Sequence, residues 1–310
     1  MNVADLAATD LAARLAHSGL YLITGQFQLC IRSALPALAA TVGLLYADYR
    51  LGDSEGFTDF HVTLDYPAGL RRWWRKQVVF EFDSALPFKP LPAAQVFPML
   101  EWGLNWCVSS YANLYLIIHA AVIEKNGFAA ILPAPPGSGK STLCAALINR
   151  GWRLLSDELT LIRTTDGQIV PLPRPVSLKN ASIKIMQAYA PQAVFSPPVY
   201  DTVKGTIAHM KAPADSVRRA TETAQPGWIV FPTYQAGAET NLAPISPAHA
   251  LMRLADNAFN YSILGLQGFD VVTGLVDSCL SYDFTYSVID EAIAAFDELA
   301  AAASASAIGS

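Results

Sequence analysis

The sequence predicts an α/β fold, and three observations support this prediction. A buried strand, a glycine-rich loop, a helix and a second strand follow one another between residues 128 and 163, which is the order of an α/β core. Hydrophobic residues make up 52% of the 310 residues and charged residues only 15%, so the chain can build a large core. The first 112 residues mix strand and helix patterns. We therefore expect an N-terminal α+β region over residues 1–112 and a core with C-terminal helices over residues 113–310.

The N-terminal region contains both kinds of periodicity. Apolar and polar residues alternate in three segments, each of which predicts a strand: residues 19–33, 57–66 and 76–83. Pro36 opens an apolar segment, which predicts a helix with proline in its first turn. Apolar residues at helical spacing predict a further helix over residues 94–110.

The second part of the chain has clearer boundaries. Residues 114–127 predict a strand pair or one bent strand that closes on Gly127. Further strands are expected over residues 128–134, 153–163 and 227–234. Ser246 and Gly265 are typical N-cap and C-cap residues, so one helix is expected between them. Proline-rich connections and a polar stretch separate these elements, and a last helix is expected from about residue 289.

The glycine-rich loop is the most informative motif. Residues 134–141 read APPGSGKS, a Walker A pattern with Ala134 in the first glycine position. Backbone N–H groups of such a loop bind phosphate oxygens, the lysine adds a cation, and the serine hydroxyl binds Mg²⁺. A chance turn is the alternative, but the flanking strand and helix favour a P-loop. The predicted nucleotide-binding residues are Pro136, Gly137, Ser138, Gly139, Lys140, Ser141 and Thr142.

Two acids follow the loop at the next strand. Asp157 and Glu158 lie 17 residues beyond Lys140, where an acid can reach Mg²⁺ or an attacking hydroxyl. A solvated acid pair at a strand end is the alternative interpretation. The predicted metal ligands are Ser141, Asp157 and Glu158. His119 lies inside an apolar run and, taken alone, is typical of a buried core histidine.

Taken together, these motifs resemble the C-terminal catalytic domain of the HPr kinase/phosphorylase family. The resemblance covers His119–Gly127, the loop at 134–141, and residues 149–158, in which the paired aspartates of the family fall on Asp157 and Glu158. It is closest to the divergent subgroup called HprK-related kinase A, to which residues 175–180, 201–209 and 257–265 are similar.

The resemblance implies a kinase of the HPr kinase type that uses ATP and Mg²⁺ to phosphorylate a serine-type hydroxyl of a protein or peptide. It implies catalytic roles for His119, Lys140, Asp157 and Glu158, and assembly into a homo-oligomer. Two other functions share the motifs. A kinase for a small molecule needs the same loop and base, and a non-catalytic nucleotide-gated binding protein needs the loop and metal.

Composition excludes several other classes. The formal net charge is −5, which does not suggest a nucleic-acid binder, because such a protein needs a basic face to neutralise phosphates. The longest apolar run, Leu114–Ile123, is shorter than the roughly 20 residues that a membrane helix needs. Four scattered cysteines lack zinc-ligand spacing. We expect no transmembrane segment, no nucleic-acid partner and a cytoplasmic location.

Overall fold

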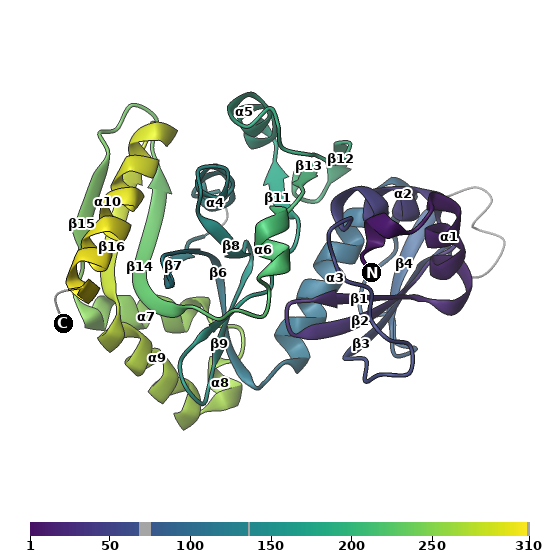
Figure 1. The fold of residues 1–310 in the computed structure, drawn as a ribbon, viewed down its shortest axis with the longest axis horizontal. Coiled ribbons are helices and arrows are strands. Elements are labelled where there is room, and N and C mark those ends of the chain that lie inside the picture. The colour runs from purple at the N-terminus through teal and green to yellow at the C-terminus, as the bar shows by residue number, and fades with distance from the viewer. Residues whose placement is uncertain (68–75, 136, 309–310) are drawn as a thin grey trace. The chain divides into compact units, whose positions relative to one another are not determined.

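A computed structural model describes residues 1–67, 76–135 and 137–308. The chain forms a mixed α/β fold with several sheets, in two compact units (Figure 1). The first unit comprises residues 1–108, 174–184 and 192–218, and the second comprises residues 109–173, 185–191 and 219–310. The predicted α/β class is confirmed at this level, while the division into domains at residues 112 and 113 stays a prediction.

The first unit contains two sheets within the described residues. The strands of one pair in the order β1 (Leu20–Thr24), β2 (Phe27–Arg32), β3 (Phe60–Asp65), β4 (Gln77–Phe82) and β5 (Leu91–Pro92). The other has the order β11 (Val176–Lys179), β13 (Gly205–Met210) and β12 (Val199–Thr202). The helices of this unit are α1 (Ala8–Ala13), α2 (Pro36–Leu45), α3 (Val96–Tyr111) and α6 (Ala214–Arg218), with short turns at Val3–Asp5, Arg14–Ser18 and Ala93–Gln95. Helix α5 spans Ala181–Tyr189.

The single strand predicted over residues 19–33 is wrong, because this segment is a hairpin. Strands β1 and β2 pair antiparallel, with Thr24 opposite Phe27. The two residues between them, Gly25 and Gln26, form the turn, and Gly25 has a φ of 59°. The buried positions are Leu20, Leu22 and Thr24 before the turn and Phe27, Leu29 and Ile31 after it, so the two-residue turn shifts the alternation by one residue. This shift at Gly25 was the signal of the turn. The predicted helix that starts at Pro36 and the strands over 57–66 and 76–83 are confirmed.

The second unit is built on one large mixed sheet. Its order is β10 (Ile169–Val170), β9 (Leu159–Arg163), β6 (Tyr115–Lys125), β7 (Phe128–Pro133), β14 (Gln225–Tyr234), β16 (Leu280–Tyr286) and β15 (Asn241–Pro244), and β8 (Arg153–Ser156) also pairs with β6. Strands β7, β14 and β16 run parallel, and β6 is antiparallel to its neighbours. The segment 114–127 is therefore one long strand, followed by a tight turn at Gly127.

Helices cover both faces of this sheet. Helices α7 (Pro247–Asn257) and α9 (Leu266–Ser278) pack on one face, in a core cluster that includes Ile118, Ala120 and Val122 of β6. On the other face lie α4 (Lys140–Ile148) and α10 (Ile289–Ile308) (Figure 1). The alternation of side chains along a strand sets which residues of β6 meet each helix layer.

The single helix predicted between Ser246 and Gly265 is also wrong. Ser246 does cap α7, accepting a hydrogen bond from the His249 N–H at 3.3 Å. The helix ends at Asn257, and a separate short helix, α8 (Tyr261–Leu264), ends at Gly265. Between the two, the extended backbone of Ala258 pairs with Ile118 of β6. This pairing over a long sequence distance overrides the local helical pattern. Helix α9 and strands β15 and β16 were not predicted.

Among the described residues, no helix combines the length and the apolar composition that crossing a membrane requires.

Candidate functional site

The glycine loop, residues 134–141, connects β7 to α4. Gly137 and Gly139 both have a φ of 89°, a backbone conformation that favours glycine. The Ser138 N–H donates to the Pro135 carbonyl at 3.3 Å, and the Leu143 N–H donates to the Gly139 carbonyl at 2.9 Å. The predicted strand, loop and helix are thus present in this order. Pro136 lies outside the described residues.

The surroundings of the loop suit an oxygen-rich anion. A Cβ added at Gly137 would have no other atom within 4 Å, so the backbone is open on this side. The Ser138 hydroxyl is buried and has no hydrogen-bond partner among the described residues. The first N–H groups of a helix, here from Gly139 onward, point outward with a positive dipole. A phosphate group would satisfy both the hydroxyl and these N–H groups.

Two tyrosines hold the loop from the β14 side. The Tyr234 N–H donates to the Ser138 carbonyl at 2.9 Å, and the Tyr286 hydroxyl donates to the Gly139 carbonyl at 3.2 Å. Their rings pack edge to face, with centroids 5.7 Å apart. Burial raises the pKa of Tyr286 well above its usual value, so its hydroxyl keeps its proton and remains a donor.

The predicted acid pair lies on the opposite side of β6 from the loop. The strand expected over residues 153–163 is interrupted between β8 and β9 at Asp157 and Glu158. Because Val122 pairs with Ser156 and His119 with Leu159, the acids lie opposite Ala121 and Ala120. Asp157 is buried, with 5% of its surface exposed, and Glu158 is half-buried.

Strand β6 therefore lies between the acids and the glycine loop. Ala120 pairs with Pro133, the last residue of β7, on one side and lies opposite Glu158 on the other. Neighbouring strands are about 4.8 Å apart, so roughly 10 Å separates the backbone of β7 from that of the acids. This places the loop entrance and the acid pair at the same end of the sheet.

The register of β6 also indicates which face of the sheet His119 occupies. Ile118 and Ala120 belong to the core under α7 and α9, so His119 between them points to the α4 face. Asp157 and Glu158 form a bend between β8 and β9, beside Ala120 and Ala121 of β6. The His119 ring is also 5.7 Å from the ring of Phe259. Of the two acids, Asp157 acts on the Cys144 thiol of α4, so it lies toward that helix.

The buried thiol of Cys144 interacts electrostatically with two of the predicted site residues. Cys144 lies on α4, one turn after Lys140. Burial raises the pKa of the Cys144 thiol well above its usual value, the Asp157 carboxylate raises it further, and the Lys140 ammonium lowers it. Lys140 and Asp157 therefore both lie near enough to Cys144 to affect its thiol. Lys140 itself is 8% exposed.

The donors at this site fit Mg²⁺ better than a transition metal. The described residues contain no group of three or more histidine, cysteine, aspartate or glutamate side chains that could hold an ion by themselves. Mg²⁺ is usually held by one or two carboxylates together with waters and substrate phosphates. Ser141 at the start of α4 and the acid pair supply that kind of partial site.

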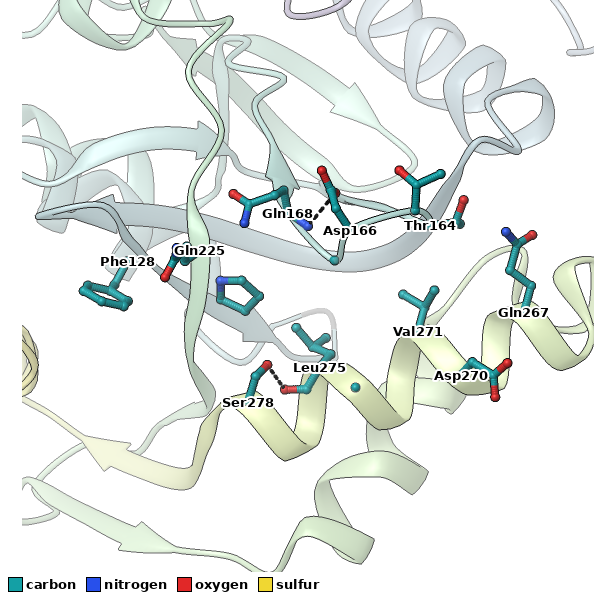
Figure 2. A pocket seen from close by; sticks show the side chains of 14 residues that line it. Phe128, Thr164, Asp166, Gln168, Gln225, Gln267, Asp270, Val271, Leu275 and Ser278 are labelled. Atoms are coloured by element: carbon teal, nitrogen blue, oxygen red, sulfur yellow. Dashed lines mark hydrogen bonds between the residues drawn. The ribbon is translucent and has the colours of Figure 1, made fainter. Parts of the chain in front are cut away.

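A cavity of about 620 Å³ in the second unit lies elsewhere (Figure 2). It is lined by Phe128 at the start of β7, by the turn between β9 and β10, and by α9. The length of β7, roughly 17 Å, separates it from the glycine loop. Its Asp166 carboxylate accepts from the Gln168 N–H at 3.1 Å and pairs with Arg163 at 2.7 Å. These contacts give Asp166 a structural role in the turn.

Tyr234, Tyr286 and Phe259 were not predicted as residues of the site. Tyr286 ends the segment LSYDFTY (280–286), whose alternating aromatic residues predict a strand and could have located it. Tyr234 ends a strand that was expected, but its contact with the loop depends on the pairing of strands far apart in sequence.

No family model matches this chain, and no curated protein matches it. Among solved structures, the chain is similar to the Hpr(Ser) kinase/phosphatase from Coxiella burnetii, with 11% identity and a TM-score of 0.26. The similarity covers 57% of this chain and 89% of the other. A TM-score at this level assigns neither a fold nor an activity to this chain.

Proposed function

We propose that this chain is a P-loop kinase that binds ATP with Mg²⁺ on the glycine loop and transfers the γ-phosphate to a serine-type hydroxyl of a protein or peptide. The observation that carries the proposal is the arrangement around β6. The glycine loop with Lys140 lies on one side, Asp157 lies on the other, and His119 lies between them on the same face. The sequence resemblance to HPr kinase supports the serine acceptor.

The loop and α4 would bind the triphosphate. Backbone N–H groups between Gly137 and Thr142 would hold phosphate oxygens, and Lys140 would add positive charge beside them. Ser141, Asp157 and Glu158 would hold Mg²⁺, which when bound offsets the negative charge of the β- and γ-phosphates.

The acid pair would also activate the acceptor. One carboxylate would accept the proton of the substrate hydroxyl while that oxygen forms a bond to the γ-phosphorus. The bond from phosphorus to the bridging oxygen would break, and ADP would leave with the electron pair. His119 would donate a hydrogen bond to the transferred phosphoryl group, so that its charge is stabilised during transfer.

Calorimetry and mass spectrometry test the proposal in two steps. The folded protein should bind MgATP, and Lys140→Ala should weaken binding by tenfold or more, since it removes the cation from the phosphate site. Asp157→Asn should retain nucleotide binding but lose transfer to serine-containing peptides by 100-fold or more. Folded protein that binds no MgATP, or phosphate transfer that survives in Lys140→Ala, contradicts the proposal.

The choice of acceptor is tested in the same assay. Peptides that contain serine, the same peptides with alanine in its place, and a panel of sugars and nucleosides are offered with MgATP. Added phosphate on the serine peptides alone is the expected result. Phosphate on a sugar or nucleoside identifies a small-molecule kinase instead, and bound ATP that is never transferred identifies a nucleotide-gated binding protein.

A further inference from the structure

Two tyrosines end neighbouring parallel strands directly beside the glycine loop. Tyr234 and Tyr286 are the last residues of β14 and β16 and lie opposite each other in the sheet. Through its N–H, Tyr234 binds the Ser138 carbonyl, and Tyr286 binds the Gly139 carbonyl through its hydroxyl. Through these contacts, the ends of β14 and β16 border the glycine loop on the side away from β6.

The position of the acid pair indicates how the nucleotide is oriented on the glycine loop. The transferred phosphate must face Asp157 and His119, which lie on the β6 side of the loop. The remainder of the nucleotide then leaves the loop on the opposite side. In that direction the carboxyl ends of β14 and β16 follow β7 in order, and ligands of open α/β sheets bind outside such strand ends.

The two rings differ in what they can offer a ligand. Tyr286 is 2% exposed, and its hydroxyl is used by the loop. Tyr234 is 51% exposed and packs its ring against that of Tyr286. The Gln235 N–H donates to the Tyr286 carbonyl at 3.0 Å, and the Ser287 hydroxyl donates to the Ala238 carbonyl at 2.7 Å. These hydrogen bonds connect the segments that follow β14 and β16. The backbone around Tyr234 is therefore held in place, and its ring packs on the ring of Tyr286.

Resting on the proposed function, we infer that the base of the nucleotide stacks on the ring of Tyr234, over the carboxyl ends of β14 and β16. A base presents a flat π-face, and a supported aromatic ring binds it with little loss of side-chain freedom. Tyr286 is a positioning residue, because it holds the Gly139 carbonyl and supports the Tyr234 ring without facing the ligand.

Two ligands separate base stacking from phosphate binding. Calorimetry with MgATP and with magnesium tripolyphosphate, which lacks the nucleoside, is performed on the wild-type protein and on Tyr234→Ala. The variant should bind MgATP about tenfold more weakly and tripolyphosphate with unchanged affinity. Its backbone N–H remains available to Ser138, so the loop stays anchored. Tyr234→Phe should bind both ligands like the wild type, because the aromatic face is kept.

Tyr286→Phe is the matched control. Loss of its hydroxyl should weaken MgATP and tripolyphosphate by the same factor, because the loop itself is loosened. If Tyr234→Ala is unfolded in thermal denaturation, Tyr234→Leu keeps the bulk without the π-face and carries the same expectation. Equal weakening of both ligands in the Tyr234 variant, or no weakening of MgATP, overturns the inference. Wild-type protein that binds neither ligand overturns the proposed function instead.

Discussion

Gly137 and Gly139 have the same backbone angle but different surroundings. Both have a φ of 89°, at which an L-residue costs about 1–2 kcal/mol. A Cβ at Gly137 would meet nothing within 4 Å. A Cβ at Gly139 would lie 2.6 Å from the Tyr286 hydroxyl oxygen and 2.9 Å from the Tyr234 Cβ. The two positions therefore separate the cost of backbone strain from the cost of a clash.

Alanine substitutions at these positions should have unequal effects. Gly137→Ala should weaken MgATP binding by roughly tenfold, which corresponds to the strain alone. Gly139→Ala should weaken it by about 100-fold or more, because the tyrosines must also move away from the loop. Titration calorimetry gives the two dissociation constants, and thermal denaturation verifies that both variants are folded. An equal loss of MgATP affinity in the two variants would show that Tyr234 and Tyr286 do not constrain the conformation of the loop.

The residues of the glycine loop could be predicted because their chemistry is local. Two glycines, a lysine and a serine within a few positions predict a phosphate-binding turn without knowledge of the fold. Tyr234 and Tyr286 could not be found in this way, because each meets the loop only through the parallel pairing of β7, β14 and β16. The direction of His119 likewise became clear only from the register of β6.

At the scale of secondary structure elements, Asn260 joins the α7–α8 connection to the start of β6. Its side chain is 0% exposed. Its carbonyl oxygen accepts from the Ile117 N–H at 3.0 Å, and its amide donates to the Tyr115 carbonyl at 2.8 Å. One buried side chain thus satisfies two backbone groups of a central strand, next to the position of His119.

Asn260→Ala should lower the free energy of unfolding by about 2–4 kcal/mol, because it leaves a buried donor and a buried acceptor unsatisfied. Asn257 offers a matched control on the same connection. Its amide donates to the Arg253 carbonyl at 2.8 Å from a half-buried position, so Asn257→Ala should cost less than about 1 kcal/mol. Urea denaturation measures both values, and a similar cost at the two positions would contradict the role given to Asn260.

At the far end of β6, Glu124 forms a buried ion pair with Arg153. Glu124 also accepts from the Gly127 N–H at 2.6 Å, and Arg153 donates to the carbonyls of Arg219 and Glu222, each at 3.0 Å. The pair therefore connects β6 and β8 to the segment that precedes β14. It lies at the opposite end of these strands from the glycine loop.

Removing one member of this pair leaves the other charge buried. Glu124→Ala should lower the free energy of unfolding by about 3–5 kcal/mol. Asp166→Ala, which breaks the exposed pair with Arg163 and the exposed hydrogen bond from the Gln168 N–H, should cost only about 1 kcal/mol. Denaturant unfolding at neutral pH compares the variants. A loss for Glu124→Ala no larger than that for Asp166→Ala would show that the buried network contributes little.

Elements with a strong local pattern were predicted, and elements that depend on distant partners were not. The strand before the loop, α4 and the cap at Ser246 follow from local spacing and capping chemistry. The division of residues 246–265 into two helices depends on the pairing of Ala258 with Ile118. Strand β13 lies in a stretch that was predicted to be a polar connection. It forms a strand because it pairs with β11 and β12, and this pairing cannot be seen in the local pattern.

At the scale of the whole molecule, both units bury weakly acidic groups in their neutral form. In the first unit, burial raises the pKa of Cys107 to about 12. Burial is also the main cause that raises the pKa values of Tyr46 and Tyr49, and the Glu101 carboxylate raises them further. In the second unit, burial raises the pKa of Cys279 to about 12 and that of Cys144 well above its usual value.

These raised pKa values predict that the protein loses stability in alkaline solution. The unfolded thiols titrate near 9.0, whereas the folded protein keeps them protonated to higher pH. The folded state therefore binds more protons than the unfolded state above about pH 9, and the free energy of unfolding falls as the pH rises. One pH unit above the unfolded pKa, each thiol should cost about 1.4 kcal/mol, or about 4 kcal/mol for the three.

Urea unfolding at about pH 8 and about pH 10 measures this loss. The double variant Cys107→Ala/Cys144→Ala removes one such thiol from each unit, so its stability should fall by about 3 kcal/mol less than that of the wild type over the same interval. Its stability at pH 8 is lower because two core side chains are shortened, and the comparison therefore uses the change with pH. If the variant and the wild type lose the same free energy between the two pH values, the buried thiols do not cause the alkaline sensitivity, and the tyrosines must account for it.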